Sequence, residues 1–286
     1  MNVKNARSAT SMSFAHRLEH PESRARQGPE RPGEDPVVIL SYLYSGAALV
    51  QEALSEDSHL ARTQSTGILP LCAAAADTWQ RVEGGNGQRL SRLALVSVRQ
   101  LVTTQVAVLL AATGKTRWCE LAAASADTDA VFRQVFPHAG FVCVHRSCTG
   151  VVAAGVEASP WGVLGPPIGR YALAHPGNSV AALAAYWVRS TDLLLQFERA
   201  NLEAAHRVRF EDVVTDPVRA LTDVRSSLRL IGEDEGLHAP DRTDSVTEEA
   251  GALTESRREV PVEMIPEDLR QRIDLLHAEL GYSQLR

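Results

Sequence analysis

The chain has 286 residues, of which 44% are hydrophobic and 22% are charged, fractions that are ordinary for a globular protein. The formal net charge of −6 argues against a broad nucleic-acid-binding surface, and the length fits one α/β domain with inserted helices. The four cysteines form no C-x-x-C pair and have no histidine at zinc spacing. We therefore expect no metal site and interpret the four cysteines as buried thiols in a reducing compartment. They are Cys72, Cys119, Cys143 and Cys148.

Residues 1–34 carry six Lys/Arg and four Glu, few apolar side chains and three prolines. This composition predicts a disordered or loosely attached tail, followed by an α/β domain over residues 35–286. The first residues lack the apolar stretch of a signal peptide, so the sequence favours a cytoplasmic protein.

The first element expected in the domain is a buried strand over residues 37–40, which are apolar and mostly β-branched. Ser45 and Gly46 then break the run, and residues 47–54 begin a helix. Because the first N–H groups of a helix lack partners and carry partial positive charge, this corner predicts a site for a nucleotide phosphate. The turn has one glycine and no lysine, so it is not a complete P-loop; an ordinary strand-to-helix corner is the alternative.

After a polar connection over residues 55–59, the chain alternates helical and strand patterns. The long apolar stretch 93–112 is interrupted by an arginine and two glutamines, which predicts a buried helix rather than a membrane span. Residues 159–178 hold four prolines and four glycines and predict an irregular lid or substrate loop. Strands are expected over 116–121, 141–145 and 207–210, and further helices over 127–136, 149–156, 180–200, 217–230 and 266–280.

This alternation predicts a three-layer α/β sandwich with a mostly parallel central sheet. Ligands of such sheets bind beyond the carboxyl ends of the strands. Arg146 follows the strand 141–145 directly, so we expect it to face the same crevice as the Ser45-Gly46 turn.

Four segments, taken in order, resemble the bacterial sulfotransferase family, which uses 3′-phosphoadenosine-5′-phosphosulfate (PAPS) on a P-loop-like α/β fold. Residues 43–49 look like the family's Pro-Arg/Lys-Ser-Gly-Thr-Thr-Leu loop for the 5′ phosphosulfate, and residues 117–120 look like its Arg-Trp-x-Glu strand. Residues 136–146 are close to the element whose last residue, an arginine, binds the 3′ phosphate. Residues 209–217 are similar to its Arg-Tyr-Glu-Asp-Leu segment, and the whole resemblance spans about residues 36–232.

Carried over position by position, the resemblance implies a PAPS site with extra cations from the C-terminal region. The residues implied are Tyr44, Ser45, Gly46, Ala47, Ala48, Arg146 and Phe210, with Arg257 and Arg258 as the further cations. Phe210 stands where the family has the tyrosine that lies near the adenine.

Several of these positions depart from the family pattern. The cation of the loop is replaced by Tyr44, both loop threonines are alanines, and the serine eight residues after Arg146 is Ala154. The family's Lys-Thr-Pro is Leu-Ala-Ala over residues 121–123. Removal of one charge-stabilising donor typically lowers the rate of catalysis by about two to three decades. These replacements exchange polar or charged groups for less polar ones, so we expect a pocket that is more apolar than a site for two phosphates.

Sulfuryl transfer also needs a group that takes the proton of the acceptor. Glu120 and His59 are the candidates for this base, and Glu120 is interpreted alternatively as a structural partner of Arg117. Two hypotheses follow. The first is a PAPS-dependent sulfotransferase that acts on a hydroxyl or amine of a small molecule. The second is a sulfotransferase-fold protein that no longer binds PAPS and serves as a non-catalytic partner or as an enzyme for an uncharged substrate.

Overall fold

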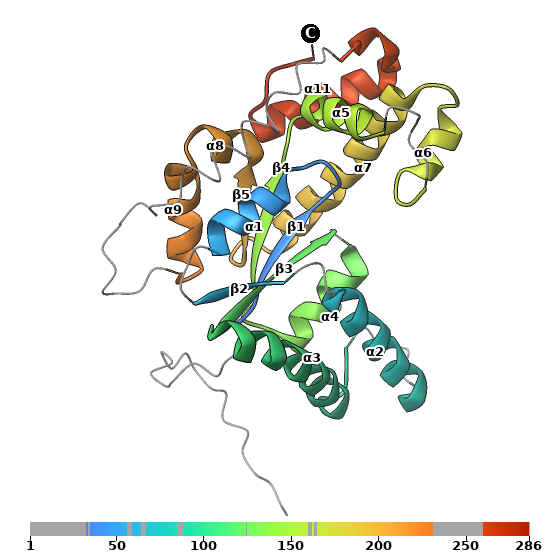
Figure 1. Cartoon of the computed structure of the whole chain (residues 1–286). Coiled ribbons are helices and arrows are strands. Elements are labelled where there is room, and N and C mark those ends of the chain that lie inside the picture. The colour runs from blue at the N-terminus through green and yellow to red at the C-terminus, as the bar shows by residue number, and fades with distance from the viewer. Residues whose placement is uncertain are drawn as a thin grey trace, which may run out of the picture. The chain divides into compact units, whose positions relative to one another are not determined.

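A computed structural model describes residues 33, 35–55, 59–63, 67–84, 89–123, 125–159, 162, 165–230 and 260–285. Apart from Gly33, the predicted tail over residues 1–34 lies outside this part of the chain. Within it, five parallel strands form one sheet (Figure 1). These are β1 (Val37–Ser41), β2 (Leu60–Arg62), β3 (Arg117–Ala123), β4 (Gly140–His145) and β5 (Ala205–Arg209), in the spatial order β2-β3-β1-β4-β5.

The helices connect and cover these strands. They are α1 (Ala47–Ser55), α2 (Ile68–Glu83), α3 (Arg92–Thr113), α4 (Ala126–Val135), α5 (Cys148–Ala158), α6 (Gly169–Ala174), α7 (Ser179–Ala200), α8 (Phe210–Thr215), α9 (Pro217–Ser227) and α11 (Glu267–Leu280), with a 3-10 turn at Val262–Met264.

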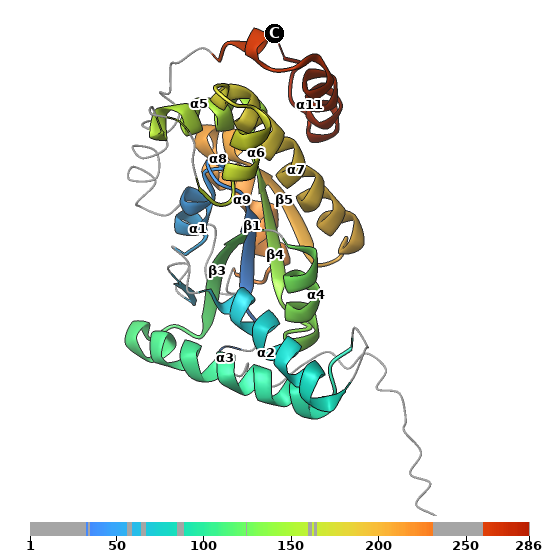
Figure 2. The same cartoon turned by 90° about the vertical axis from the view of Figure 1, so that its right-hand side faces the viewer.

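The central strands are buried on both faces, as their unbroken apolar sequences require. Val37 and Ile39 point into one core with α1, α8 and α9, whereas Val38 and Leu40 point into the other. The second core also contains side chains of α2, α3, α4, α7 and α11. Figures 1 and 2 show the two sets of helices on either side of the sheet. The predicted three-layer α/β sandwich is confirmed, and all five strands in the described part of the chain are parallel.

Four short elements were not predicted: β2, α6, α8 and the 3-10 turn Val262–Met264. The strand β2 follows the polar connection at residues 55–59 and has only three residues, too few for a readable alternation, but Leu60 and Ala61 are buried beside β3. The segment 159–178, expected to be irregular, contains the six-residue helix α6. A six-residue helix flanked by proline and glycine leaves no periodic signal in a sequence.

The helix α3 differs from its prediction more instructively. Residues 93–112 are helical as expected, but the prediction of a buried helix was wrong. One stripe is buried, at every fourth residue from Ala94 to Leu110, while the opposite face is exposed. By length and composition alone α3 could cross a membrane, and 28% of its most apolar window is buried.

Candidate functional site

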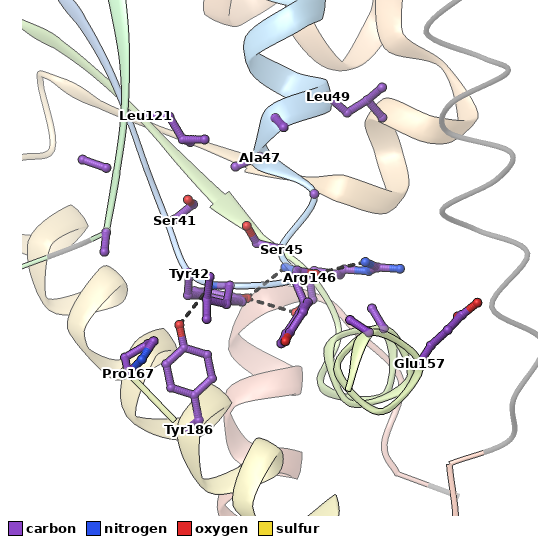
Figure 3. Close-up of a pocket in the computed structure, with 18 residues that line it drawn as sticks. Ser41, Tyr42, Ser45, Ala47, Leu49, Leu121, Arg146, Glu157, Pro167 and Tyr186 are labelled. Carbon is purple, nitrogen blue, oxygen red and sulfur yellow. Dashed lines mark hydrogen bonds between the residues drawn. The ribbon is translucent and has the colours of Figure 1, made fainter. Parts of the chain in front are cut away.

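A cavity of about 690 Å³ opens at the carboxyl ends of the central strands (Figure 3). It lies at the point where the connections diverge, because α1 leaves β1 toward one face of the sheet and the helices after β3 and β4 lie on the other. Such switch points are the usual ligand sites of open parallel sheets. The lining is mostly apolar and comes from Ser41–Leu49, Leu121–Ala123, Arg146, Ala154, Glu157, Ala158, Pro167 and Tyr186.

The turn between β1 and α1 forms one wall of the cavity. Ser45 N–H donates to the Tyr42 carbonyl at 3.2 Å, and Tyr44 has a φ of 65°. A hydrogen bond from the fourth residue to the first and a positive φ at the third are features of a type II turn, where glycine is usual. A tyrosine in this conformation is strained, so contacts around the turn must hold it.

Three aromatic side chains hold the turn and the end of β4 together. The Tyr42 hydroxyl accepts from Arg146 N–H at 3.0 Å and lies 3.1 Å from the Arg146 carbonyl, to which it donates. Trp187 Nε1–H donates to the same carbonyl at 2.8 Å. The Tyr186 hydroxyl accepts from Leu43 N–H at 2.9 Å. Burial raises the pKa of both tyrosines, Tyr42 and Tyr186, so the two hydroxyls stay protonated at neutral pH.

Arg146 joins the turn to the rest of the site. Its Nη1 donates to the Tyr44 carbonyl at 3.0 Å, and its guanidinium lies 4.4 Å from the centre of the Phe210 ring. The residue is only 5% exposed, and burial lowers its pKa from the ordinary value while the carboxylate of Glu211 opposes that shift. Among the described residues that line the cavity, Arg146 is the sole basic one.

Gly46 is required by the way Phe210 packs. It has a φ of +77°, and a Cβ atom there would lie 2.2 Å from the Phe210 ring. Phe210 is 1% exposed, between Gly46 and the guanidinium of Arg146. Its ring is therefore a support for Arg146 in this structure and presents no open face to an adenine.

The helix α5 begins directly beyond Arg146, and its first amides are bound by protein groups. Ser147 N–H donates to Glu211 Oε1 at 2.9 Å, and the Tyr282 hydroxyl donates to Glu211 Oε2 at the same distance. Cys148 N–H donates to His277 Nε2 at 3.1 Å. Burial lowers the pKa of His277, which keeps the imidazole neutral and able to accept this bond.

A second buried network lies behind β4. His145 is fully buried, and its Nε2 lies 2.7 Å from Glu198 Oε1, while Arg207 Nε donates to Glu198 Oε2 at 2.9 Å. Burial alone would raise the pKa of Glu198, but the hydrogen bonds from His145 and Arg207 outweigh it and the pKa is lowered. The side chain of His145 thus belongs to the core beside α7 and does not line the cavity.

The structure brings most of the expected cofactor residues together. The expected residues that line the cavity are Tyr44, Ser45, Gly46, Ala47, Ala48 and Arg146, and Ala154 lines it as well. The alanines therefore do stand at the cavity wall, and no shift of register restores a hydroxyl there. Arg257 and Arg258, the expected extra cations, lie outside the described residues.

The two candidate bases are not brought to the cavity. Glu120 is 1% exposed and accepts a hydrogen bond from the Thr63 hydroxyl. It lies in β3 one residue before Leu121, the first residue of this strand that lines the cavity. The carbonyl of His59 accepts from Arg117 N–H at 2.9 Å, which places His59 at the amino-terminal ends of the strands, the opposite edge of the sheet. Neither residue is among those that line the cavity.

Several site residues were missed by sequence reasoning. Tyr42, Tyr186 and Trp187 support the site through hydroxyl and indole groups, but an aromatic residue in an apolar segment is indistinguishable from a core residue in sequence. Glu157 is the one carboxylate among the described lining residues, and Figure 3 shows it directed away from the other labelled side chains.

Comparisons with known proteins agree with this fold. The chain resembles the sulfotransferase domain of the curacin biosynthetic pathway with a TM-score of 0.54 and 15% identity, over 89% of this chain and 99% of that one. The sulfotransferase domain of the Synechococcus PCC 7002 olefin synthase gives 0.54 and 16%, over 91% and 99%. At these identities the likeness shows the fold alone. None of the curated proteins compared with the chain matches it.

The family assignment comes from the sequence of the domain itself. The model of the Sulfotransferase family matches residues 36–234, well over half of the chain. This range begins just before β1 and ends after α9, so it contains both the β1–α1 turn and Arg146. The resemblance noted in the sequence is confirmed, and the chain belongs to the sulfotransferase family.

Proposed function

We propose that the protein binds PAPS in the cavity and transfers its sulfuryl group to a hydroxyl or amine of a small molecule. The observation that carries this proposal is the joining of two anion-binding elements in one cavity. The start of α1 lies at the Ser45-Gly46 turn, and Arg146 donates to the carbonyl of Tyr44 in that turn at 3.0 Å. A helix N-terminus and a guanidinium side by side fit a ligand with two separated anionic groups.

Each element has a distinct role in this proposal. Arg146 holds the 3′ phosphate, and the amides at the start of α1 hold the 5′ phosphosulfate. Bound PAPS supplies the activated sulfuryl group. Because little covalent chemistry falls to the protein in such transfers, positioning and charge stabilisation are its main contributions. Tyr42 and Trp187 fix the backbone of Arg146 and so fix the distance between the two anion-binding elements.

A second candidate is favoured by the composition of the cavity wall. Ala47, Ala48 and Ala154 line it where the family has hydroxyls, and neither Glu120 nor His59 reaches it. These features suit an uncharged, apolar ligand, in a family member that no longer binds PAPS. The two candidates differ in whether the cavity binds a bisphosphorylated nucleotide.

Calorimetric titration tests the proposal. The wild-type protein is titrated with 3′-phosphoadenosine-5′-phosphate (PAP) and with 5′-AMP, which lacks the 3′ phosphate, and so is the variant Arg146→Ala. We expect micromolar binding of PAP by the wild type. We expect Arg146→Ala to weaken PAP binding at least tenfold, because a charge-assisted bond is lost, and to leave AMP binding unchanged.

The matched control is Arg199→Ala, which removes an exposed guanidinium paired with Glu279 on the surface and should leave PAP binding unaltered. No binding of PAP at millimolar concentration refutes the PAPS proposal and supports the apolar-ligand candidate. Equal loss of PAP and AMP in Arg146→Ala refutes the assignment of Arg146 to the 3′ phosphate.

We further propose that the partner is a small-molecule acceptor and that the protein works in the cytoplasm. The four cysteines are buried free thiols, and burial raises the pKa of Cys72 and of Cys119 to about 12. Such thiols are unreactive, which is in keeping with a reducing compartment.

A further inference from the structure

Two serine hydroxyls face the cavity from either side of the turn between β1 and α1. Ser41 is the last residue of β1 and is 8% exposed, and Ser45 ends the turn and is 1% exposed. Both residues line the cavity, and neither hydroxyl is hydrogen-bonded to a protein group within the described part of the chain. Buried hydroxyls in native proteins nearly always have a hydrogen-bond partner. We therefore expect the partner of these two to be a molecule that enters the cavity.

The turn brings the two serines close to each other. Ser45 N–H donates to the Tyr42 carbonyl at 3.2 Å, and the first and fourth residues of such a turn have Cα atoms less than about 7 Å apart. Ser41 directly precedes this turn. Figure 3 shows the hydroxyls of Ser41 and Ser45 both directed toward the space between Leu121 and Ala47. A small group bound in this space would lie beside both hydroxyls.

The first amides of α1 border the same space. No group among the described residues accepts a hydrogen bond from the amides of Gly46, Ala47 or Ala48, and all three residues line the cavity. Unpartnered N–H groups at the start of a helix carry partial positive charge and bind anions. Two hydroxyls and three amides, all neutral donors, are therefore available to one oxyanion.

We propose that Ser41, Ser45 and these amides form a cradle for the 5′ phosphosulfate of PAPS, an inference that rests on the function proposed above. The resemblance to the family gives Ser41 no role, because this residue precedes the loop segment 43–49. Ala47 and Ala48 have no hydroxyl, so Ser41 supplies from the end of β1 a donor that the start of the helix lacks. Donors that are already in place beside an oxyanion are an effective means of stabilising its charge.

The cradle and Arg146 then hold different ends of the nucleotide. Arg146 holds the 3′ phosphate in the proposed function, whereas Ser41 contacts only the 5′ end. A variant of Ser41 should therefore affect ligands that carry a 5′ phosphate and leave the others unaffected. This selectivity separates a binding residue from one that merely shapes the cavity.

Calorimetric titration with PAP and with adenosine 3′-phosphate (3′-AMP), which lacks the 5′ phosphate, tests the role of Ser41. The 5′ phosphate of PAP stands in for the phosphosulfate. Ser41→Ala should weaken PAP binding at least tenfold, because a hydrogen bond to a charged group is lost, and should leave 3′-AMP binding unchanged. It should not lower the Tm of the ligand-free protein, since no described protein group is bonded to the hydroxyl.

The matched control is Ser55→Ala at the other end of α1. The Ser55 hydroxyl donates to the Gln51 carbonyl at 2.6 Å and is not part of the cavity wall. This variant also removes one serine hydroxyl from the same helix region, and it should leave the binding of both nucleotides unchanged.

Three results would overturn the inference while leaving the proposed function in place, provided that the wild type binds PAP. They are an unchanged PAP affinity in Ser41→Ala, an equal loss of PAP and 3′-AMP affinity, and a Tm lower by more than about 3 °C. The last two would show that Ser41 supports the structure of the pocket instead of binding the 5′ end. A wild type that does not bind PAP refutes the proposed function, and this inference with it.

Discussion

The packing of Phe210 against Gly46 leads to a sharp prediction for the variant Gly46→Ala. An alanine at a φ of +77° is in the left-handed region, which costs about 1–2 kcal/mol for a residue with a side chain. Its Cβ would also lie 2.2 Å from two atoms of the Phe210 ring. Phe210 is buried and carries the guanidinium of Arg146 at 4.4 Å, so a movement of the ring that relieves the overlap would disturb this contact.

We expect this overlap to add about 1–3 kcal/mol, the usual cost of overpacking a core. The free energy of unfolding of Gly46→Ala should thus fall by about 2–5 kcal/mol, measured by equilibrium denaturation in urea. Gly114→Ala is the matched control. Gly114 has a φ of +68° and no atom within 4 Å of the Cβ position, so this variant incurs the backbone cost alone.

The double variant Gly46→Ala/Phe210→Leu separates the two causes further. Removing the ring removes the overlap, so the double variant should be more stable than the sum of the single effects predicts, by about 1–3 kcal/mol. A Gly46→Ala protein that is no less stable than Gly114→Ala, or single effects that simply add, would refute the packing explanation.

Three other variants test the supports of the site. The pKa of His277 is lowered by burial, so its contribution to stability should be complete above about pH 6.5 and fall as the pH drops below that value. His277→Gln can still accept from the Cys148 amide and should reduce the dependence of Tm on pH in melts between pH 5 and 7.5. An unchanged dependence would show that His277 does not cause it. Glu198→Ala leaves a buried imidazole and a guanidinium without their acceptor and should lower the free energy of unfolding by about 3–5 kcal/mol in urea; a loss below 1 kcal/mol would show that the network does not stabilise the fold. Tyr186→Phe removes the acceptor of the Leu43 amide and should lower Tm by about 2–8 °C, for a loss of about 1–2 kcal/mol; an unaltered Tm would mean that the turn does not depend on this bond.

The fold could be predicted where local pattern and burial agree. The short, β-branched apolar runs of β1 and β4 are typical of strands buried on both faces, and the structure places both in the parallel sheet. The strand β2 could not be predicted, because its three residues become a strand only through pairing with β3. The exposed face of α3 was mispredicted because an apolar face looks the same in sequence whether a core or nothing in the same chain covers it.

The candidate site could be predicted only where a motif fixes the backbone. Ser45, Gly46 and Arg146 were placed correctly at the cavity, since a strand end and a turn determine where they lie. His59 was chosen for its chemistry alone, and chemistry does not say which edge of the sheet a residue occupies; Glu120 lies in a strand next to the cavity-lining Leu121, but is itself not among the residues that line the cavity. The support from Tyr186 joins residues 143 positions apart, and no local pattern records such a contact.

The two candidate functions predict opposite changes in ligand affinity when the charge of Arg146 is removed. Its guanidinium is almost fully buried, and burial disfavours its charged form. An anionic ligand beside it would supply a charge partner, whereas an apolar ligand that closes the cavity would bury the charge further without one. Arg146→Met keeps most of the side-chain volume and removes the charge.

If the cavity serves PAPS, Arg146→Met should weaken PAP binding at least tenfold in calorimetry. If the cavity serves an uncharged ligand, the same variant should bind the neutral dye Nile red more tightly than the wild type does, by about tenfold, because a buried charge no longer opposes binding. The two expected changes in affinity have opposite signs, so one variant distinguishes the two functions. If Arg146→Met changes neither affinity, the guanidinium of Arg146 faces no ligand and serves only to hold the Tyr44 carbonyl and the Phe210 ring in place.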